Sequence, residues 1–145
     1  MNADCGHPAP AASLADAVFA ELAHALARLA ETGEETVVDL RSLPFGPADL
    51  EALAEKLGTG EVTVTLAVAG RSEVRETGWA GIWWVRHFGD GEDVVAEEVQ
   101  VTRIPEILVS HPDDVAFAAR RMADAVVTTG PQEPTAADEE DMSRG

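Results

Sequence analysis

The chain has 145 residues, of which 46% are hydrophobic, so it is long enough to fold as one domain around its own core. Its 27 acidic and 10 basic side chains give a formal net charge of −17. This charge repels a nucleic-acid backbone and an anionic membrane surface, which argues against both as partners and favours cationic ones.

The chain shows no pattern for export or for membrane insertion. No stretch approaches the roughly 20 apolar residues that span a bilayer. The N-terminus lacks the basic start and the apolar run of a signal peptide, and the single Cys5 cannot form an internal disulfide. We therefore expect a cytoplasmic protein that does not insert into a membrane.

The first part of the chain predicts two helices and a short strand. Residues 1–12 are small, polar and proline-containing, and are predicted to be a disordered leader. Ser13 can cap a helix, and Gly33 is its expected C-terminal stop. A short strand follows at residues 36–40, and Pro47 suits the first turn of a second helix. Apolar residues of the first helix recur at helical spacing: Leu14, Val18, Leu22, Leu26 and Leu29.

Four strands with short connections follow. Residues 61–69 alternate between apolar and polar side chains, which is typical of a half-buried strand. Segments 71–77, 81–88 and 94–103 are separated from it and from one another by short glycine-containing turns. Consecutive strands with short connections favour an antiparallel meander.

A third helix and a tail complete the chain. Ser110 can cap the helix and Pro112 fits its first turn. Residues 128–145 are acidic and proline-bearing and are predicted to be a disordered tail. The order of elements predicts a single α+β domain over residues 13–127, in which three helices pack on an antiparallel four-stranded meander plus a short extra strand.

All three tryptophans lie within or beside the strand predicted at residues 81–88. Successive strand side chains point to opposite faces, so Trp83 and Trp84 cannot share a face. We expect Trp83 to point into the core and Trp84 to point outward beside Arg86, because the face of Trp83 carries no full charge.

An outward Trp84 allows two interpretations that stay open at this point. Either a helix or a neighbouring side chain covers its face, or the face binds a partner protein, since Trp and Arg are enriched at such sites. The candidate partner-binding residues are Trp79, Ile82, Trp84 and Arg86.

The sequence shows no pattern for catalysis. It contains no Gly-x-Ser-x-Gly elbow, phosphate-binding loop or His-Glu-x-x-His motif, and its histidines are scattered. Cys5 and His7 alone make a poor metal site where four ligands are usual. We therefore predict no catalytic residue, no metal site and no cofactor, and do not expect an enzyme.

Several motifs occur in a recognisable order. They are Val-Asp-Leu-Arg-Ser-Leu-Pro at 38–44, Leu-Gly-Thr-Gly-Glu-Val at 57–62, Glu-Thr at 76–77, Gly-Ile-Trp-Trp-Val at 81–85 and Val-Gln-Val-Thr-Arg-Ile-Pro-Glu-Ile-Leu at 99–108. Together they resemble the C-terminal conserved region of the HupH/HyaF hydrogenase expression/formation proteins, over about residues 14–120. Two departures are that HyaF-type members have an additional N-terminal region, and that Gln100 stands where the family is expected to carry an acidic residue.

The resemblance implies an accessory protein or chaperone for maturing NiFe hydrogenases, which acts on the iron–sulfur small-subunit precursor or on other maturation proteins. It implies no catalytic residues. The small-subunit precursor carries a twin-arginine export signal with a basic start, so the acidic surface is expected to attract it and the face of Trp84 and Arg86 to hold it. The charge can also serve solubility alone.

Two other hypotheses stay open: an enzyme with an unrecognised small-molecule pocket, and a structural subunit of a hydrogenase complex. The sequence predicts no oligomeric state.

Overall fold

The structure, a computed structural model of the chain, describes residues 13–67 and 70–129. Two compact units divide the chain, the first ending at Pro105 and the second beginning at Glu106. The single domain predicted over residues 13–127 spans both units, and its boundaries stay predictions.

The first helix, α1 (Leu14–Thr32), begins with the expected capping box. The Ser13 hydroxyl oxygen accepts from the backbone N–H of Asp16 at 3.1 Å, and the Asp16 carboxylate accepts from the backbone N–H of Ser13 at 3.3 Å. Two N–H groups that the helix leaves unpaired are thereby satisfied. Gly33 ends the helix with a φ of 80°, as predicted.

Three short elements follow α1, the first of which is a strand of the sheet. Strand β1 (Thr36–Asp39) leads into a 3₁₀ turn, η1 (Leu40–Ser42), and then into the helix α2 (Pro47–Leu57). Pro47 occupies the first turn of α2, as the sequence predicts.

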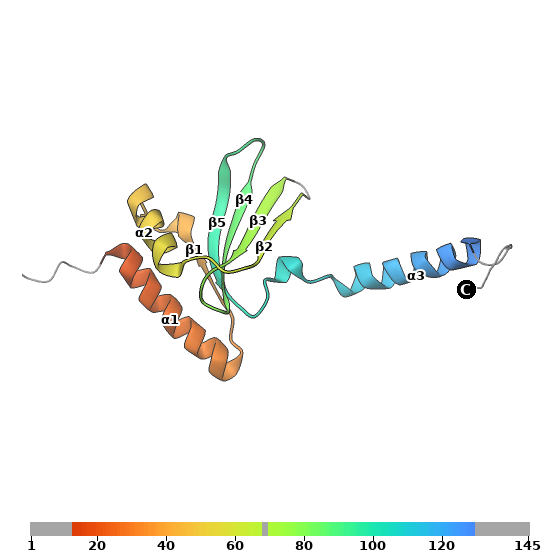
Figure 1. Cartoon of the computed structure of the whole chain (residues 1–145), viewed down its shortest axis with the longest axis horizontal. Helices are drawn as coiled ribbons and strands as arrows, with labels where there is room; N and C mark the ends of the chain where they lie inside the picture. The colour runs from red at the N-terminus through yellow and green to blue at the C-terminus, as the bar shows by residue number, and fades with distance from the viewer. Residues whose placement is uncertain (1–12, 68–69, 130–145) are drawn as a thin grey trace, which may run out of the picture. The chain divides into compact units, whose positions relative to one another are not determined.

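The sheet has five antiparallel strands in the order β1-β5-β4-β3-β2. The predicted meander is therefore confirmed, and β1 is the extra strand at the edge beside β5 (Figure 1). The strand expected over residues 61–69 is shorter than predicted. The four meander strands are β2 (Thr63–Leu66), β3 (Arg71–Glu76), β4 (Ile82–Phe88) and β5 (Val94–Val101).

Helices α1 and α2 lie on the same side of the sheet and cover one of its faces (Figure 1). Their buried apolar side chains pack with those of β4 and β5 into one core, which removes these groups from water. The core members are Ala15, Val18, Leu22, Ala25, Leu29, Leu40, Leu53, Leu57, Ile82, Trp84, Val99 and Val101.

The second unit contains a short 3₁₀ turn, η2 (Glu106–Leu108), and the helix α3 (Pro112–Thr129). Thr128 and Thr129 are helical, although the sequence places them in the tail. The third helix is thus formed, and its expected packing on the sheet stays a prediction. The predicted disordered leader, residues 1–12, and residues 130–145 of the predicted tail lie outside the described residues.

The two adjacent tryptophans lie on opposite faces of β4, but both are buried. Trp84 belongs to the core under α1 and α2, and only 3% of it is exposed. Trp83 is 8% exposed on the other face, where its indole N–H donates to the Thr102 carbonyl at 3.1 Å. The expected orientations are therefore wrong: Trp84 lies in the core, and Trp83 lies on the opposite face, outside the core cluster. The alternative, that helices cover the face of Trp84, is correct.

No helix in the described ranges is both long enough and apolar enough to cross a bilayer.

Gly81, just before β4, lies against two leucine side chains of α1. Its φ is 95°, and a Cβ atom there would lie 3.0 Å from Leu26 Cδ1 and 3.3 Å from Leu29 Cδ2. We predict that Gly81→Ala lowers the free energy of unfolding in urea by about 2–4 kcal/mol, because strain and crowding add. Gly33→Ala is the matched control, since its φ is also positive but open space surrounds it, and should cost about 1–2 kcal/mol. Equal losses would contradict this packing.

Candidate functional site

Trp84 and Arg86 both bind one buried carboxylate. The indole N–H of Trp84 donates to Glu97 Oε2 at 2.7 Å, and Arg86 Nε donates to the same oxygen at 2.8 Å. Glu97 lies on the neighbouring strand and is only 6% exposed. Because a buried indole N–H or carboxylate is costly when unpaired, these contacts stabilise the core. Trp84 and Arg86 therefore hold the sheet together where the sequence had suggested a binding face.

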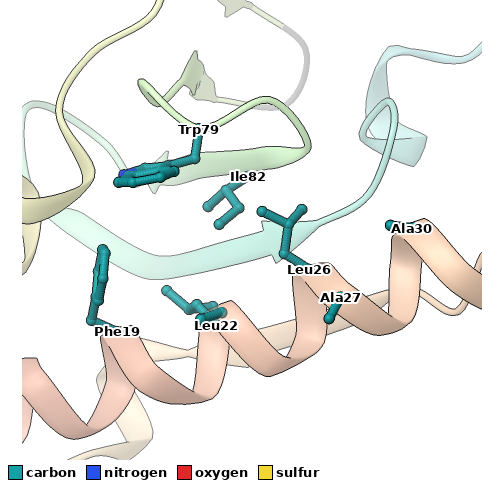
Figure 2. A pocket seen from close by; sticks show the side chains of 8 residues that line it. Phe19, Leu22, Leu26, Ala27, Ala30, Trp79 and Ile82 are labelled. Atoms are coloured by element: carbon teal, nitrogen blue, oxygen red, sulfur yellow. The ribbon is translucent and has the colours of Figure 1, made fainter.

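The other two predicted partner-binding residues, Trp79 and Ile82, line an apolar groove between α1 and the turn that joins β3 to β4. The groove has a volume of about 410 Å³. Figure 2 shows side chains of α1 rising toward Trp79 and Ile82. The complete lining is Phe19, Leu22, Ala23, Leu26, Ala27, Ala30, Trp79 and Ile82.

Hydrogen bonds fix the turn that carries Trp79. The Thr77 hydroxyl donates to the Ile82 carbonyl at 2.8 Å and accepts from the Trp79 backbone N–H at 3.1 Å. The Trp79 indole N–H donates to the Lys56 carbonyl at 3.2 Å. The ring meets Phe19 edge to face, with centroids 5.9 Å apart. Trp79 is nevertheless 46% exposed, so a large aromatic surface is held in place but remains open to solvent.

Three small side chains that the sequence analysis did not single out contribute to the α1 side of the groove. Ala23, Ala27 and Ala30 are exposed and line the groove together. They lie three to four residues apart and therefore on one side of the helix, next to the buried leucine stripe. The sequence does show that the apolar face of this helix is wider than the leucine stripe that the core buries. This signal is weak, because alanine is common on both buried and exposed helix faces.

An ion pair lies beside Phe19 at one end of the groove. At the start of α1, Lys56 Nζ is 2.8 Å from Asp16 Oδ1 and 5.5 Å from the Phe19 ring centroid. The hydrogen bond from Lys56 is the main cause that lowers the pKa of Asp16 below its usual value, and bonds from Ser13 add to it. The ion pair is therefore fully formed at pH values above the ordinary pKa of an aspartate. It is lost as the pH falls through the lowered pKa of Asp16.

A second hollow of about 670 Å³ adjoins the groove at the other end of α1 and shares Leu26 and Ala30 with it. Glu76 and Arg103 are its charged lining residues, and their formal charges cancel. The groove itself is lined by apolar side chains alone, so its chemistry suits the burial of an apolar surface.

A serine, a histidine and a glutamate meet on the opposite face of the sheet, but they do not form a catalytic triad. Ser72 Oγ is 2.7 Å from His87 Nδ1, while His87 Nε2 is 3.9 Å from Glu98 Oε2. The second distance exceeds a hydrogen bond, so the carboxylate does not orient the imidazole. These residues are cross-strand neighbours of β3, β4 and β5. Among the described residues, no three His, Cys, Asp or Glu side chains are grouped to hold a metal ion, and Cys5 and His7 lie outside them.

Residues 13–129 match the family model of the HupH hydrogenase expression protein, C-terminal conserved region. The chain is 35% identical over 107 residues to the hydrogenase expression/formation protein HoxQ of Azotobacter vinelandii, an alignment that covers 72% of this chain and 38% of that protein. It is 25% identical over 118 residues to the hydrogenase expression/formation protein HupH of Rhizobium leguminosarum bv. viciae, covering 81% and 42% of the two chains.

A solved structure is also similar. The hydrogenase expression protein HupH from Thiobacillus denitrificans ATCC 25259 matches with a TM-score of 0.74 and 38% sequence identity, over 79% of this chain and 96% of that one. The α+β fold is therefore shared with a solved structure, whereas the chain spans only 38% and 42% of the length of the two longer relatives.

The buried carboxylate of Glu97 can be tested by mutation. We predict that Glu97→Ala lowers the free energy of unfolding by about 2–4 kcal/mol, because Arg86 and the indole N–H of Trp84 both lose their acceptor. Urea denaturation followed by circular dichroism measures the change. Glu98→Ala is the matched control, since that side chain is 25% exposed, and should cost less than about 1 kcal/mol. A loss at Glu97 no larger than the loss at Glu98 would contradict a structural role for the carboxylate.

Proposed function

Because the chain belongs to the family of HupH hydrogenase expression proteins, through their C-terminal conserved region, we propose that it is an accessory protein in the maturation of a NiFe hydrogenase. Its partner in this proposal is the precursor of the iron–sulfur small subunit, and its task is to hold that precursor during maturation in the cytoplasm.

The apolar groove along α1 is the observation that supports binding of a polypeptide. Covering the exposed part of Trp79 would remove about 100 Å² from water, which is worth about 2–3 kcal/mol before entropy is subtracted. Phe19 and the alanines would add to this. Small-molecule sites usually contain several converging polar groups that orient the ligand. The apolar lining offers none, so it favours a polypeptide over the small-molecule substrate of the enzyme hypothesis.

The net charge of −17 supports a basic partner. A precursor whose export signal begins with basic residues would be attracted by this surface, which raises the association rate at low salt. The apolar groove would then supply most of the stability of the complex, because surface ion pairs contribute little. In this proposal the exposed ring of Trp79 contacts the precursor, the buried Ile82 supports the groove from the core, and Trp84 and Arg86 stabilise the sheet.

The groove and the precursor can be tested together. We predict that Ala27→Glu weakens capture of the small-subunit precursor at least tenfold, because a carboxylate would be buried against an apolar surface. Pull-down of the precursor by the tagged protein, from cells that make both, measures the change. Ala17→Glu is the matched control, since it adds the same charge to an exposed position of α1 outside the groove lining, and should leave capture unchanged.

Three other results would count against the proposal. Failure of the unchanged protein to retain the precursor would remove the small subunit as partner. Retention of mature, active hydrogenase in place of the precursor would favour a structural subunit. Equal loss with Ala17→Glu and Ala27→Glu would assign the effect to added charge and remove the groove from the binding surface.

A further inference from the structure

We propose that the groove along α1 receives one amphipathic helix of the partner, about three turns long, with its apolar face toward the groove and a basic residue near Glu31. This inference rests on the proposed function, since it specifies which kind of precursor segment is held.

The length of the groove sets the length of the segment. Its α1 lining runs from Phe19 to Ala30, eleven positions along the helix. At 1.5 Å per residue this is about 16 Å, or three helical turns. Because the side chains of Ala23, Ala27 and Ala30 are short, they leave space along α1 between Phe19 and the C-terminal end of the helix. Small side chains of this kind allow a second helix to approach closely.

The backbone chemistry of the groove favours a helix over an extended peptide. An extended segment needs partners for its own N–H and C=O groups, as a strand finds at a sheet edge. One wall of the groove is α1, whose interior backbone groups bond within the helix. The other wall is formed by Trp79 and Ile82, whose backbone groups are already bonded. The Trp79 N–H donates to the Thr77 hydroxyl, the Ile82 N–H donates to the Trp79 carbonyl, and the Thr77 N–H donates to the Ile82 carbonyl. An occupant must therefore satisfy its own backbone, as a helix does.

Glu31 favours a cation at the C-terminal end of the groove. It is exposed in the last turn of α1, where the helix dipole disfavours a negative side chain, and that turn has no basic residue. The nearby Arg28 pairs with Glu34 at 3.4 Å. Within the described ranges Glu31 itself makes no ion pair, so a lysine or arginine of the partner would offset both its charge and that of the helix end.

The net charge also argues against a second copy of this chain as the occupant. Two chains that each have a formal charge of −17 repel one another. A partner helix with basic residues is attracted instead, so charge complementarity and the apolar lining favour the same occupant.

A synthetic peptide tests this inference without the precursor. The probe is an 18-residue fluorescein-labelled peptide with leucines on one helical face and lysines at both ends, measured by fluorescence anisotropy with the full chain. Its control has the same composition, with the leucines distributed around the helix, so attraction of lysine to an acidic protein is equal for both. We expect the amphipathic peptide to bind at least tenfold more tightly than the control.

Matched variants locate the binding and its charge. Ala27→Glu should weaken the amphipathic peptide at least tenfold, and Ala17→Glu should not. Glu31→Gln should weaken it about twofold through the lost cation contact, while Glu21→Gln, which removes the same charge from an exposed α1 position outside the groove lining, should have no such effect. Equal binding of the two peptides, or no effect of Ala27→Glu, would overturn the inference.

Two results separate this inference from the proposed function. The Ala27→Glu variant could lose peptide binding but still capture the precursor as well as the unchanged protein does. The proposed function would then be retained, and the proposal that the groove binds a helix of the precursor would be wrong. If sedimentation shows a dimer that Ala27→Glu converts to a monomer, the occupant is a second copy and the proposed partner helix is wrong.

Discussion

The carboxylate of Glu97 is the contact on which the arrangement of the sheet and its helices depends. It accepts hydrogen bonds from the Trp84 indole at 2.7 Å and from the Arg86 guanidinium at 2.8 Å. With its N–H satisfied and the arginine charge balanced, the Trp84 ring can lie in the core beneath α1 and α2. The helices then cover this face of the sheet. Helix α1 lies beside the β3–β4 turn, and the apolar side chains of α1 that face the turn form the groove.

Much of the fold could be predicted because its signals are local. The capping box of Ser13 and Asp16, the stop at Gly33 and the start at Pro47 depend on residues within one helical turn. The antiparallel meander follows from four strand patterns with short connections. The opposite orientation of Trp83 and Trp84 also follows from strand geometry alone.

The burial of Trp84 could not be predicted in the same way, because it depends on residues brought together by the fold. The charge of Arg86 suggests a solvent-facing side until Glu97, on the adjacent strand, is seen to balance it. The groove could not be predicted from the sequence for a related reason. Ala23 and Ala27 carry no pattern that separates a docking face from an ordinary exposed helix side, and Trp79 faces them only because the turn is bonded to α2. Of the four expected binding residues, Trp79 and Ile82 line the groove.

In the proposed complex Trp79, and neither of the buried tryptophans, contacts the partner. The most direct measurement is fluorine NMR of the chain labelled with 5-fluorotryptophan, in which its three tryptophans are assigned by single Trp→Phe variants and followed as the unlabelled small-subunit precursor is added. If Trp79 lies in the interface, its resonance shifts or broadens while those of Trp83 and Trp84 stay in place. An unchanged Trp79 resonance in a complex that has formed, or a change confined to Trp84, would contradict it.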